Sequence, residues 1–221
     1  MTILAGADMM GPKPIGGKIL NKVPYTEDND LSRIKSLDEL KEMALDCRRC
    51  DLRAECTNVV FGEGKPTARL MLIGEGPGAE EDRLGRPFAG KAGQLLDQIL
   101  GAVDLDRYEH TYIANVVKCR PPGNRVPRPE EARQCLPWLY RQIELLSPAV
   151  IVLLGSTALQ NLVDPRAKIT KMRGQWLHSK SGIKIMPTYH PAALLRDSSK
   201  KRPVWEDFQM IRDEYLKINN Q

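Results

Sequence analysis

Four short apolar runs stand far apart along the chain, and segments with helical periodicity separate them. Each run is apolar almost without interruption, and the runs cover residues 69–74, 111–118, 149–155 and 182–187. The segments with a helical period cover residues 92–103, 129–146, 157–163 and 203–218. Strands that alternate with helices indicate parallel pairing, and uninterrupted apolar strands indicate burial on both faces. The pattern therefore predicts an α/β fold, a three-layer sandwich with a four-stranded parallel sheet flanked by helices.

The chain before residue 36 follows no such period. Glycine and proline recur there, so we expect residues 1–35 to form an extended or poorly ordered arm. Ser36 then fits the N-cap of a helix, and Glu39 after it completes a capping box. We expect residues 36–221 to form a single α/β domain.

Composition and charge exclude several classes of protein. The 221 residues suffice for one domain with a hydrophobic core, and no apolar run has the length of about 20 residues that spans a bilayer. Residues 1–17 lack the basic start and apolar stretch of a signal peptide, so we expect a cytoplasmic protein in a reducing compartment. The net charge of +5 permits a nucleic-acid partner without requiring one.

Ligands of parallel sheets bind beyond the carboxyl ends of the strands, so the loops after the four runs are the candidates for chemistry. The loop at 74–78 reads GEGPG, and its glycines let a backbone approach a ligand closely. It lacks the Gly-Lys-Ser/Thr of a phosphate-binding loop, and Pro77 does not suit a dinucleotide. A plain turn is the alternative, but Glu75 at the strand end is placed for chemistry rather than for packing.

The loop at 85–93 reads GRPFAGKAG and holds one of the three phenylalanines of the chain. Phe88 either folds back onto the core or offers a flat platform on which a base stacks, a contact worth about 1–3 kcal/mol. Lys91 stands near the start of the following helix, where it and backbone amides suit a phosphate group.

Two further polar residues stand at strand ends. Asn115 lies in an otherwise apolar strand, so its amide needs a partner, either nearby backbone or a ligand. An amide donates and accepts, which matches the imide edge of a uracil-like base, whereas cytosine presents the opposite pattern. His190 directly follows the last strand. A structural role is the alternative for a lone histidine, and its shared location with the other singular residues favours a functional one.

Four of the five cysteines form a candidate metal site. Cys47 and Cys50 are spaced C-x2-C, and Cys119 and Cys135 follow with fifteen residues between them. Such a set suits either zinc or an iron–sulfur cluster, and the spacing does not decide between them. The alternative is that Cys119 and Cys135 are buried thiols without a metal, and we expect Cys56 to be an unliganded thiol.

In this order, the motifs resemble those of the family 4 uracil-DNA glycosylases, the iron–sulfur-containing branch of that superfamily. The resemblance covers roughly residues 36–217, and the matching motifs are GEGPG at 74–78, GRPFAGKAG at 85–93, NVVKCRPP at 115–122 and HPAALLR at 190–196, together with four cysteines. It implies a four-stranded parallel sheet between helices. It also implies a DNA-repair enzyme that flips uracil out of DNA and hydrolyses the N-glycosidic bond, leaving an abasic site.

The resemblance also implies roles for individual residues. The four cysteines would hold a [4Fe–4S] cluster, which selects iron over zinc. Phe88 would stack on the flipped uracil, Asn115 would read its edge and His190 would contact a carbonyl oxygen of the base. The pocket would further be lined by Glu75, Gly76 and Pro77.

From this resemblance we expect a particular mechanism. His190 stabilises the negative charge that develops on the uracil, while Glu75 orients water and favours the cationic sugar. The alternative for Glu75 is that backbone amides hold its carboxylate instead. Either Leu194 or Leu195, beside Arg196, fills the space left by the flipped nucleotide, and the other leucine is buried in the core. A phosphate-facing surface is expected from the basic residues Lys91, Lys118, Arg120, Arg125 and Arg196.

The expected partner is uracil-containing DNA, single- or double-stranded, bound by a monomer. Two other functions remain open at this point. One is a glycosylase for another modified base, and the other is a non-catalytic DNA-binding module on the same fold.

Overall fold

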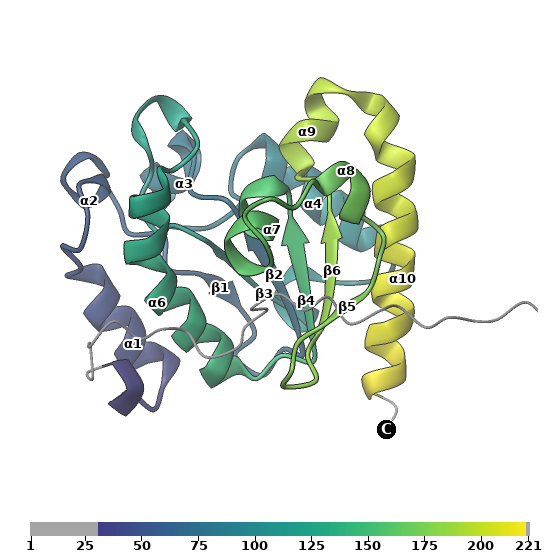
Figure 1. The fold of residues 1–221 in the computed structure, drawn as a ribbon, viewed down its shortest axis with the longest axis horizontal. Helices are drawn as coiled ribbons and strands as arrows, with labels where there is room; N and C mark the ends of the chain where they lie inside the picture. The colour runs from purple at the N-terminus through teal and green to yellow at the C-terminus, as the bar shows by residue number, and fades with distance from the viewer. Residues whose placement is uncertain (1–30, 220–221) are drawn as a thin grey trace, which may run out of the picture.

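The computed structural model describes residues 31–219, in which one sheet has six strands in the order β1-β3-β2-β4-β6-β5 (Figure 1). The four parallel strands are β2 (Leu70–Gly74), β3 (Thr111–Asn115), β4 (Val150–Leu154) and β6 (Lys184–Thr188). Two antiparallel edge strands are β1 (Glu63–Gly64) and β5 (Leu177–His178). The predicted α/β fold with four parallel strands is confirmed. The edge strands escape prediction because two residues are too few to show a period.

Helices pack on both faces of this sheet (Figure 1). One face carries α1 (Leu37–Leu45), α2 (Leu52–Glu55), α6 (Pro129–Leu146), α7 (Ser156–Leu162) and α8 (Ile169–Met172). The other face carries α4 (Lys91–Gly101), α9 (Pro191–Arg196) and α10 (Lys201–Asn219). Short elements in the connections are α3 (Ala79–Leu84), α5 (Arg107–His110) and the 3₁₀ turns Leu31–Arg33, Pro122–Asn124 and Ser198–Lys200.

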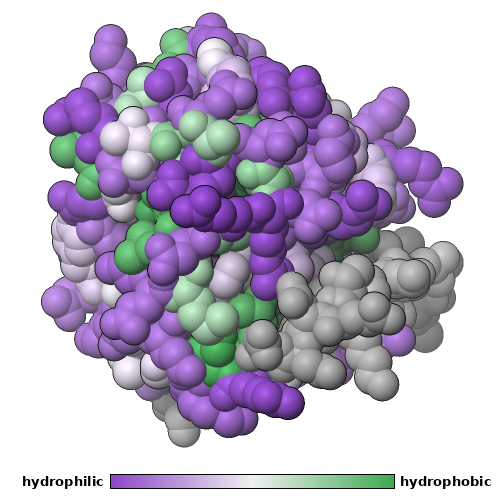
Figure 2. All heavy atoms as spheres, turned by 90° about the vertical axis from the view of Figure 1, so that its left-hand side faces the viewer, coloured by the Kyte–Doolittle hydropathy of each residue, from purple (hydrophilic) through white to green (hydrophobic). Residues whose placement is uncertain are grey.

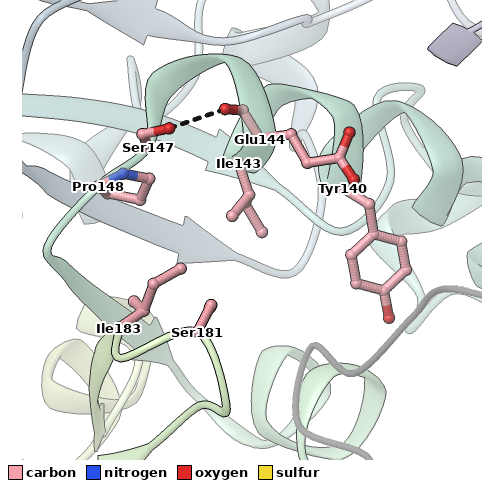
Figure 3. A pocket seen from close by; sticks show the side chains of 7 residues that line it. All are labelled: Tyr140, Ile143, Glu144, Ser147, Pro148, Ser181 and Ile183. Atoms are coloured by element: carbon pink, nitrogen blue, oxygen red, sulfur yellow. Dashed lines mark hydrogen bonds between the residues drawn. The ribbon is translucent and has the colours of Figure 1, made fainter.

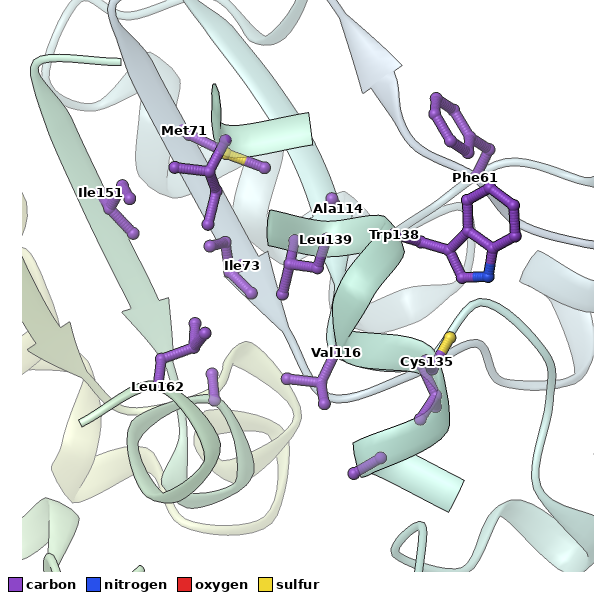
Figure 4. Close-up of a cluster of buried hydrophobic side chains, with 14 of the residues drawn as sticks. Phe61, Met71, Ile73, Ala114, Val116, Cys135, Trp138, Leu139, Ile151 and Leu162 are labelled. Carbon is purple, nitrogen blue, oxygen red and sulfur yellow. The ribbon is translucent and has the colours of Figure 1, made fainter. Parts of the chain in front are cut away.

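Two hydrophobic cores lie on the two faces of the sheet. Because side chains alternate along a strand, Met71 and Ile73 of β2 enter the core that contains Leu139 of α6 (Figure 4). Leu72 of the same strand enters the other core, which contains Phe208 of α10. Burial on both faces explains why the strands read as continuous apolar runs.

The first residues that the structure describes pack against the core that contains Met71 and Leu139. The hydroxyl of Ser36 accepts a hydrogen bond from the backbone N–H of Glu39 at 3.2 Å, so the predicted N-cap of α1 is confirmed. Leu31 and Ile34, which the sequence places in the arm, are buried in the same core. The rest of the predicted arm, residues 1–30, lies outside the described residues.

The surface on the side of α1 and α2 is largely hydrophilic, with hydrophobic groups divided among small patches (Figure 2). No helix among residues 31–219 is long and apolar enough to cross a membrane.

The strand register brings the ends of the four parallel strands to a common edge. Gly74 pairs with Asn115, and Leu154 pairs with Thr188. The loops that follow β2, β3, β4 and β6 therefore leave the sheet side by side. We call this edge, with the loops that follow these strands, the carboxyl edge.

Candidate functional site

Three segments meet over Gly74 at the carboxyl edge. A Cβ atom on Gly74 would lie 2.5 Å from Oδ1 of Asn115 and 2.7 Å from Cζ of Phe88. Real side chains do not approach that closely, so only glycine fits at this strand end. The structure thus brings together two of the predicted site residues, from β3 and from the loop before α4.

Asn115 carries an acceptor that the protein leaves unused. Its side chain is only 2% exposed, and Oδ1 is a buried atom with no hydrogen-bond partner in the described part of the chain. An unmet buried acceptor costs about 1–3 kcal/mol. The arrangement is therefore suited to a ligand that presents an N–H group at this point.

The loop that carries Phe88 is held in a strained conformation. Phe88 has a φ of +51°, in the left-handed region that non-glycine residues rarely adopt. Its carbonyl oxygen accepts a hydrogen bond from Nη1 of Arg107 at 2.8 Å, and the carbonyl of Pro87 accepts one from Nη2 of the same side chain. A Cβ on Gly93 would lie 1.7 Å from the Phe88 carbonyl oxygen, so the first turn of α4 also requires glycine.

A carboxylate fixes the same loop from the other side. Glu81 of α3 accepts hydrogen bonds from the backbone N–H groups of Ala89 and Gly90 at 2.9 and 2.8 Å. Its second oxygen accepts one from the N–H of Gly78 at 3.0 Å. One side chain therefore joins the loop after β2 to the loop that presents Phe88.

His190 caps α9 directly after β6 and stacks on Phe88, with ring centroids 5.4 Å apart and planes 28° from parallel. Its Nδ1 accepts the backbone N–H of Ala192 at 3.2 Å. Burial lowers the pKa of His190 to about 4, helped by the positive charge of Arg196 and opposed by Glu81. The imidazole is thus neutral at pH 7, and because Nδ1 accepts, its proton lies on Nε2, which is free to donate to a ligand.

Glu75 is half-buried at the end of β2, and its carboxylate accepts a hydrogen bond from the hydroxyl of Thr157 on α7. Gly76 follows without room for a side chain, since a Cβ there would lie 2.6 Å from Cγ2 of Val117. Pro77 is buried beyond it. The loop therefore presents one carboxylate whose orientation is set by a neighbouring element.

The two leucines of α9 differ in exposure. Leu194 is 2% exposed and belongs to the core, whereas Leu195 is 54% exposed beside Arg196 at the end of the helix. The expectation that one of the pair is buried is confirmed.

The predicted basic surface needs a correction. Lys118 is 2% exposed, and its ammonium group points inward to the carbonyl of Asn115, so the prediction that it faces phosphate is wrong. Arg125 is paired with Glu131 at 2.6 Å. Lys91 and Arg196 are exposed at the carboxyl edge. A lysine at the end of an apolar run looks solvent-exposed in sequence, and only the fold buries it.

The four predicted metal ligands line one cavity between α1, α6 and the segment after β3. Its walls include Cys47, Cys50, Cys119 and Cys135, with apolar neighbours such as Trp138. Among residues 31–219, no three His, Cys, Asp or Glu side chains converge closely enough to hold a single metal ion. A four-iron cluster binds each thiolate at a different iron, so its ligands do not have to converge on one point.

Burial in this cavity disfavours ionisation of the cysteine thiols. Burial raises the pKa of Cys119, and burial raises the pKa of Cys135 to about 12. Thiolates at these positions therefore need a positive centre beside them, which is what a bound metal supplies. Cys56 is also buried but is not among the residues that line the cavity.

Three residues that organise the site were missed by the sequence reasoning: Glu81, Arg107 and Thr157. Glu81 stands in an acidic run that reads as a solvated helix start, and Arg107 follows an ordinary turn. Thr157 lies 82 residues from the carboxylate it contacts. No local signal in the sequence distinguishes them, because each acts through a partner that only the fold brings near.

Comparisons with known proteins point to one family. The sequence pattern of the Uracil DNA glycosylase superfamily matches residues 61–209, which include every loop of the carboxyl edge. The type-4 uracil-DNA glycosylase of Thermotoga maritima is 46% identical over 184 residues, or 82% of this chain and 95% of that protein. The type-4 enzyme of Sulfurisphaera tokodaii is 42% identical over 186 residues, or 80% of this chain and 84% of that protein. That of Archaeoglobus fulgidus is 40% identical over 185 residues, or 80% and 92%.

Proposed function

The chain belongs to the uracil-DNA glycosylase superfamily, and from this premise we propose how its residues excise uracil. It is a uracil-DNA glycosylase, a DNA-repair hydrolase that cleaves the N-glycosidic bond of uracil and leaves an abasic site. The observation that carries the assignment of the site is the buried, unpaired Oδ1 of Asn115 next to the stacked rings of Phe88 and His190.

Base recognition falls to two side chains. Phe88 offers one face to the flipped base, a stacking contact worth about 1–3 kcal/mol. The amide of Asn115 accepts the imide N–H of uracil and donates to the adjacent oxygen, whereas cytosine leaves both groups unpaired. Gly76 and Pro77 line the same pocket and exclude bulkier groups from it.

Two further side chains act on the bond that breaks. As the glycosidic bond loosens, negative charge grows on the uracil and positive charge on the sugar. The neutral imidazole of His190 donates from Nε2 to a uracil oxygen and stabilises the first charge. The carboxylate of Glu75, aimed by Thr157, orients the attacking water and stabilises the second.

The protein binds its DNA as a monomer, and both single- and double-stranded uracil-containing DNA are substrates. Leu195 fills the gap in the base stack when the nucleotide leaves it, since it is the exposed leucine of the pair. Lys91 and Arg196, both exposed at the same edge, contact phosphates.

We infer that Cys47, Cys50, Cys119 and Cys135 hold a [4Fe–4S] cluster, which all four reach from the walls of one cavity. When bound, such a cluster would have a structural role, because four thiolates would leave no iron position open to substrate. Cys47 and Cys50 would attach the segment between α1 and α2 to Cys119 after β3 and to Cys135 on α6.

One assay tests the function. The protein is incubated with a uracil-containing single strand, with its thymine counterpart and with a strand that carries another modified base, and abasic sites are then cleaved with alkali. Scission of the uracil strand alone supports the assignment. Binding without scission supports a non-catalytic module instead, and scission only at another modified base supports a different glycosylase.

A second experiment tests the metal. Purified protein should be brown, contain about four irons per chain and lose them in the variant Cys135→Ser. Cys56→Ser is the matched control and should keep its iron, because Cys56 is not among the residues that line the cavity. Zinc in place of iron, or iron retained by Cys135→Ser, would contradict the proposed cluster.

A further inference from the structure

Lys118 is a buried charged residue to which the proposed chemistry assigns no role. It is 2% exposed, in the segment that follows β3. Its ammonium nitrogen Nζ donates to the backbone oxygen of Asn115 at 2.9 Å and to Oε1 of Gln142 on α6 at 2.6 Å. These are the hydrogen-bond partners of Nζ in the described structure.

The burial of this side chain is costly. Among residues 31–219 no carboxylate pairs with Lys118, and both hydrogen-bond acceptors of its Nζ are uncharged. Removing an ammonium group from water costs several kcal/mol unless its surroundings compensate. A methionine of similar length would avoid that cost, so packing alone does not account for a lysine here.

The position of Lys118 explains the role of the hydrogen bond from its ammonium group to the carbonyl of Asn115. Asn115 is the last residue of β3, and β1 pairs with β3 only at Tyr112 and Ile113. The carbonyl of Asn115 therefore lies beyond the neighbouring edge strand, and the ammonium of Lys118 supplies a donor there. The backbone N–H of Lys118 also lies 3.3 Å from Sγ of Cys135.

We propose that Lys118 is a positioning residue for Asn115, an inference that rests on the base-reading role proposed above. By holding the carbonyl of Asn115, it fixes the backbone from which the amide side chain projects. The unpaired Oδ1 then stays aimed at the base rather than turning to nearby backbone. Lys118 also connects the base-reading residue with the four-cysteine cavity, because its side chain contacts Asn115 and its backbone N–H contacts Cys135.

The test is a double-mutant cycle read by equilibrium binding of free uracil to the iron-loaded protein. Lys118→Met should weaken binding about tenfold, the effect of losing one charge-assisted hydrogen bond. Asn115→Ala should weaken it more strongly, and the double variant should bind no worse than Asn115→Ala, because the two residues act as one unit. A merely structural role for Lys118 predicts additive losses.

Lys184→Met is the matched control. Lys184 pairs with Glu214 at 2.6 Å at the opposite end of β6, so uracil binding should stay within twofold of the wild type. Where Lys118→Met does not yield folded, iron-loaded protein, Lys118→Gln replaces it. The side chain of glutamine is one bond shorter and carries no charge, so the charge-assisted hydrogen bond to the Asn115 carbonyl is lost, and the same loss and the same cycle are expected.

The possible results distinguish a failure of this inference from a failure of the proposed function. Uracil binding by Lys118→Met or Lys118→Gln within twofold of the wild type, or additive losses in the cycle, overturns the role of Lys118 and leaves the glycosylase intact. If the wild type excises uracil but Asn115→Ala binds free uracil as well as the wild type does, the base-reading role of Asn115 is overturned, and this inference with it.

Discussion

The amino ends and the carboxyl ends of the parallel strands differ in their chemistry, and the volume of a surface hollow does not reveal this difference. The amino ends border an open hollow of about 450 Å³, lined by Tyr140, Ile143, Glu144, Ser147, Pro148, Ser181 and Ile183 (Figure 3). The hydroxyl of Ser147 donates to the carbonyl of Glu144 at 3.0 Å, and no lining residue has a buried side-chain nitrogen or oxygen without a partner. The chemistry of the carboxyl edge is less fully satisfied.

That chemistry consists of an unpaired amide oxygen, a left-handed phenylalanine and a histidine kept neutral by burial. Each lowers the stability of the folded chain, and each is held in place by contacts from other elements. An unpaired buried acceptor therefore marks the site more sharply than an open volume does, whereas backbone strain alone does not, because Ser147 in the wall of the hollow also has a positive φ, of +46°. Substitutions at the two ends should therefore have very different effects.

The largest effect is expected at Asn115. In Asn115→Asp a carboxylate replaces the donor half of the amide and places negative charge against a uracil oxygen. Excision of uracil in single-turnover experiments should fall by about a thousandfold. The circular dichroism spectrum and iron content should match the wild type, and a rate within tenfold of the wild type would remove Asn115 from the base-reading role.

His190→Ala comes next. Removing the Nε2 donor should lower the single-turnover rate by about a hundredfold, because the charge on the leaving uracil loses its stabilisation. Binding of a uracil-containing strand should remain within about twofold, since most affinity comes from phosphate contacts. Equal losses in rate and in DNA affinity would instead indicate a collapsed site.

Glu81→Ala should have a smaller effect on KM. The substitution frees the N–H groups of Ala89 and Gly90 and loosens the loop that presents Phe88, so KM should rise about tenfold with a modest change in kcat. Glu80→Ala is the matched control, because Glu80 pairs only with the exposed Arg83 on the helix surface in the described structure. Similar kinetics for the two variants would contradict the pinning role of Glu81.

The neutral histidine also predicts a pH effect on stability. The pKa of His190 is about 4 in the folded protein and about 6.5 in an unfolded chain. Between these values the unfolded chain binds a proton that the folded protein does not, so this group destabilises the fold progressively as pH falls from about 6.5 to 4. Denaturant midpoints at pH 7.5 and 4.5 should therefore differ less in His190→Gln than in the wild type.

The smallest effects are expected at the amino ends. Ser181→Ala and Tyr140→Phe alter the hollow of Figure 3 without touching the carboxyl edge, so kcat and KM should stay within twofold of the wild type. A tenfold loss in either variant would show that this hollow takes part in the reaction and would break the contrast between the two ends.

Much of the architecture follows from local pattern. Continuous apolar runs predict the four parallel strands, and the rule that ligands bind beyond the carboxyl ends of parallel strands places Gly74, Asn115 and His190 at one edge. The edge strands β1 and β5 could not be predicted, because two residues carry no period. Lys118 could not be placed correctly either, since its burial depends on Gln142, 24 residues further along the chain.

The sequence by itself determined the fold class, the loops that carry chemistry and the family. These are encoded by neighbouring residues: hydrophobic period, turn-forming glycines and motif order. The tertiary structure alone decided which acceptor stays unpaired, which carboxylate pins the Phe88 loop and which lysine is buried beside Asn115. Those outcomes depend on partners that are distant along the chain, such as Glu81 and Ala89, 8 residues apart, and Lys118 and Gln142, 24 residues apart, which meet only in the folded protein. The physical reason is that hydrogen bonding and burial are properties of the packed interior, whereas propensity and period are properties of the chain.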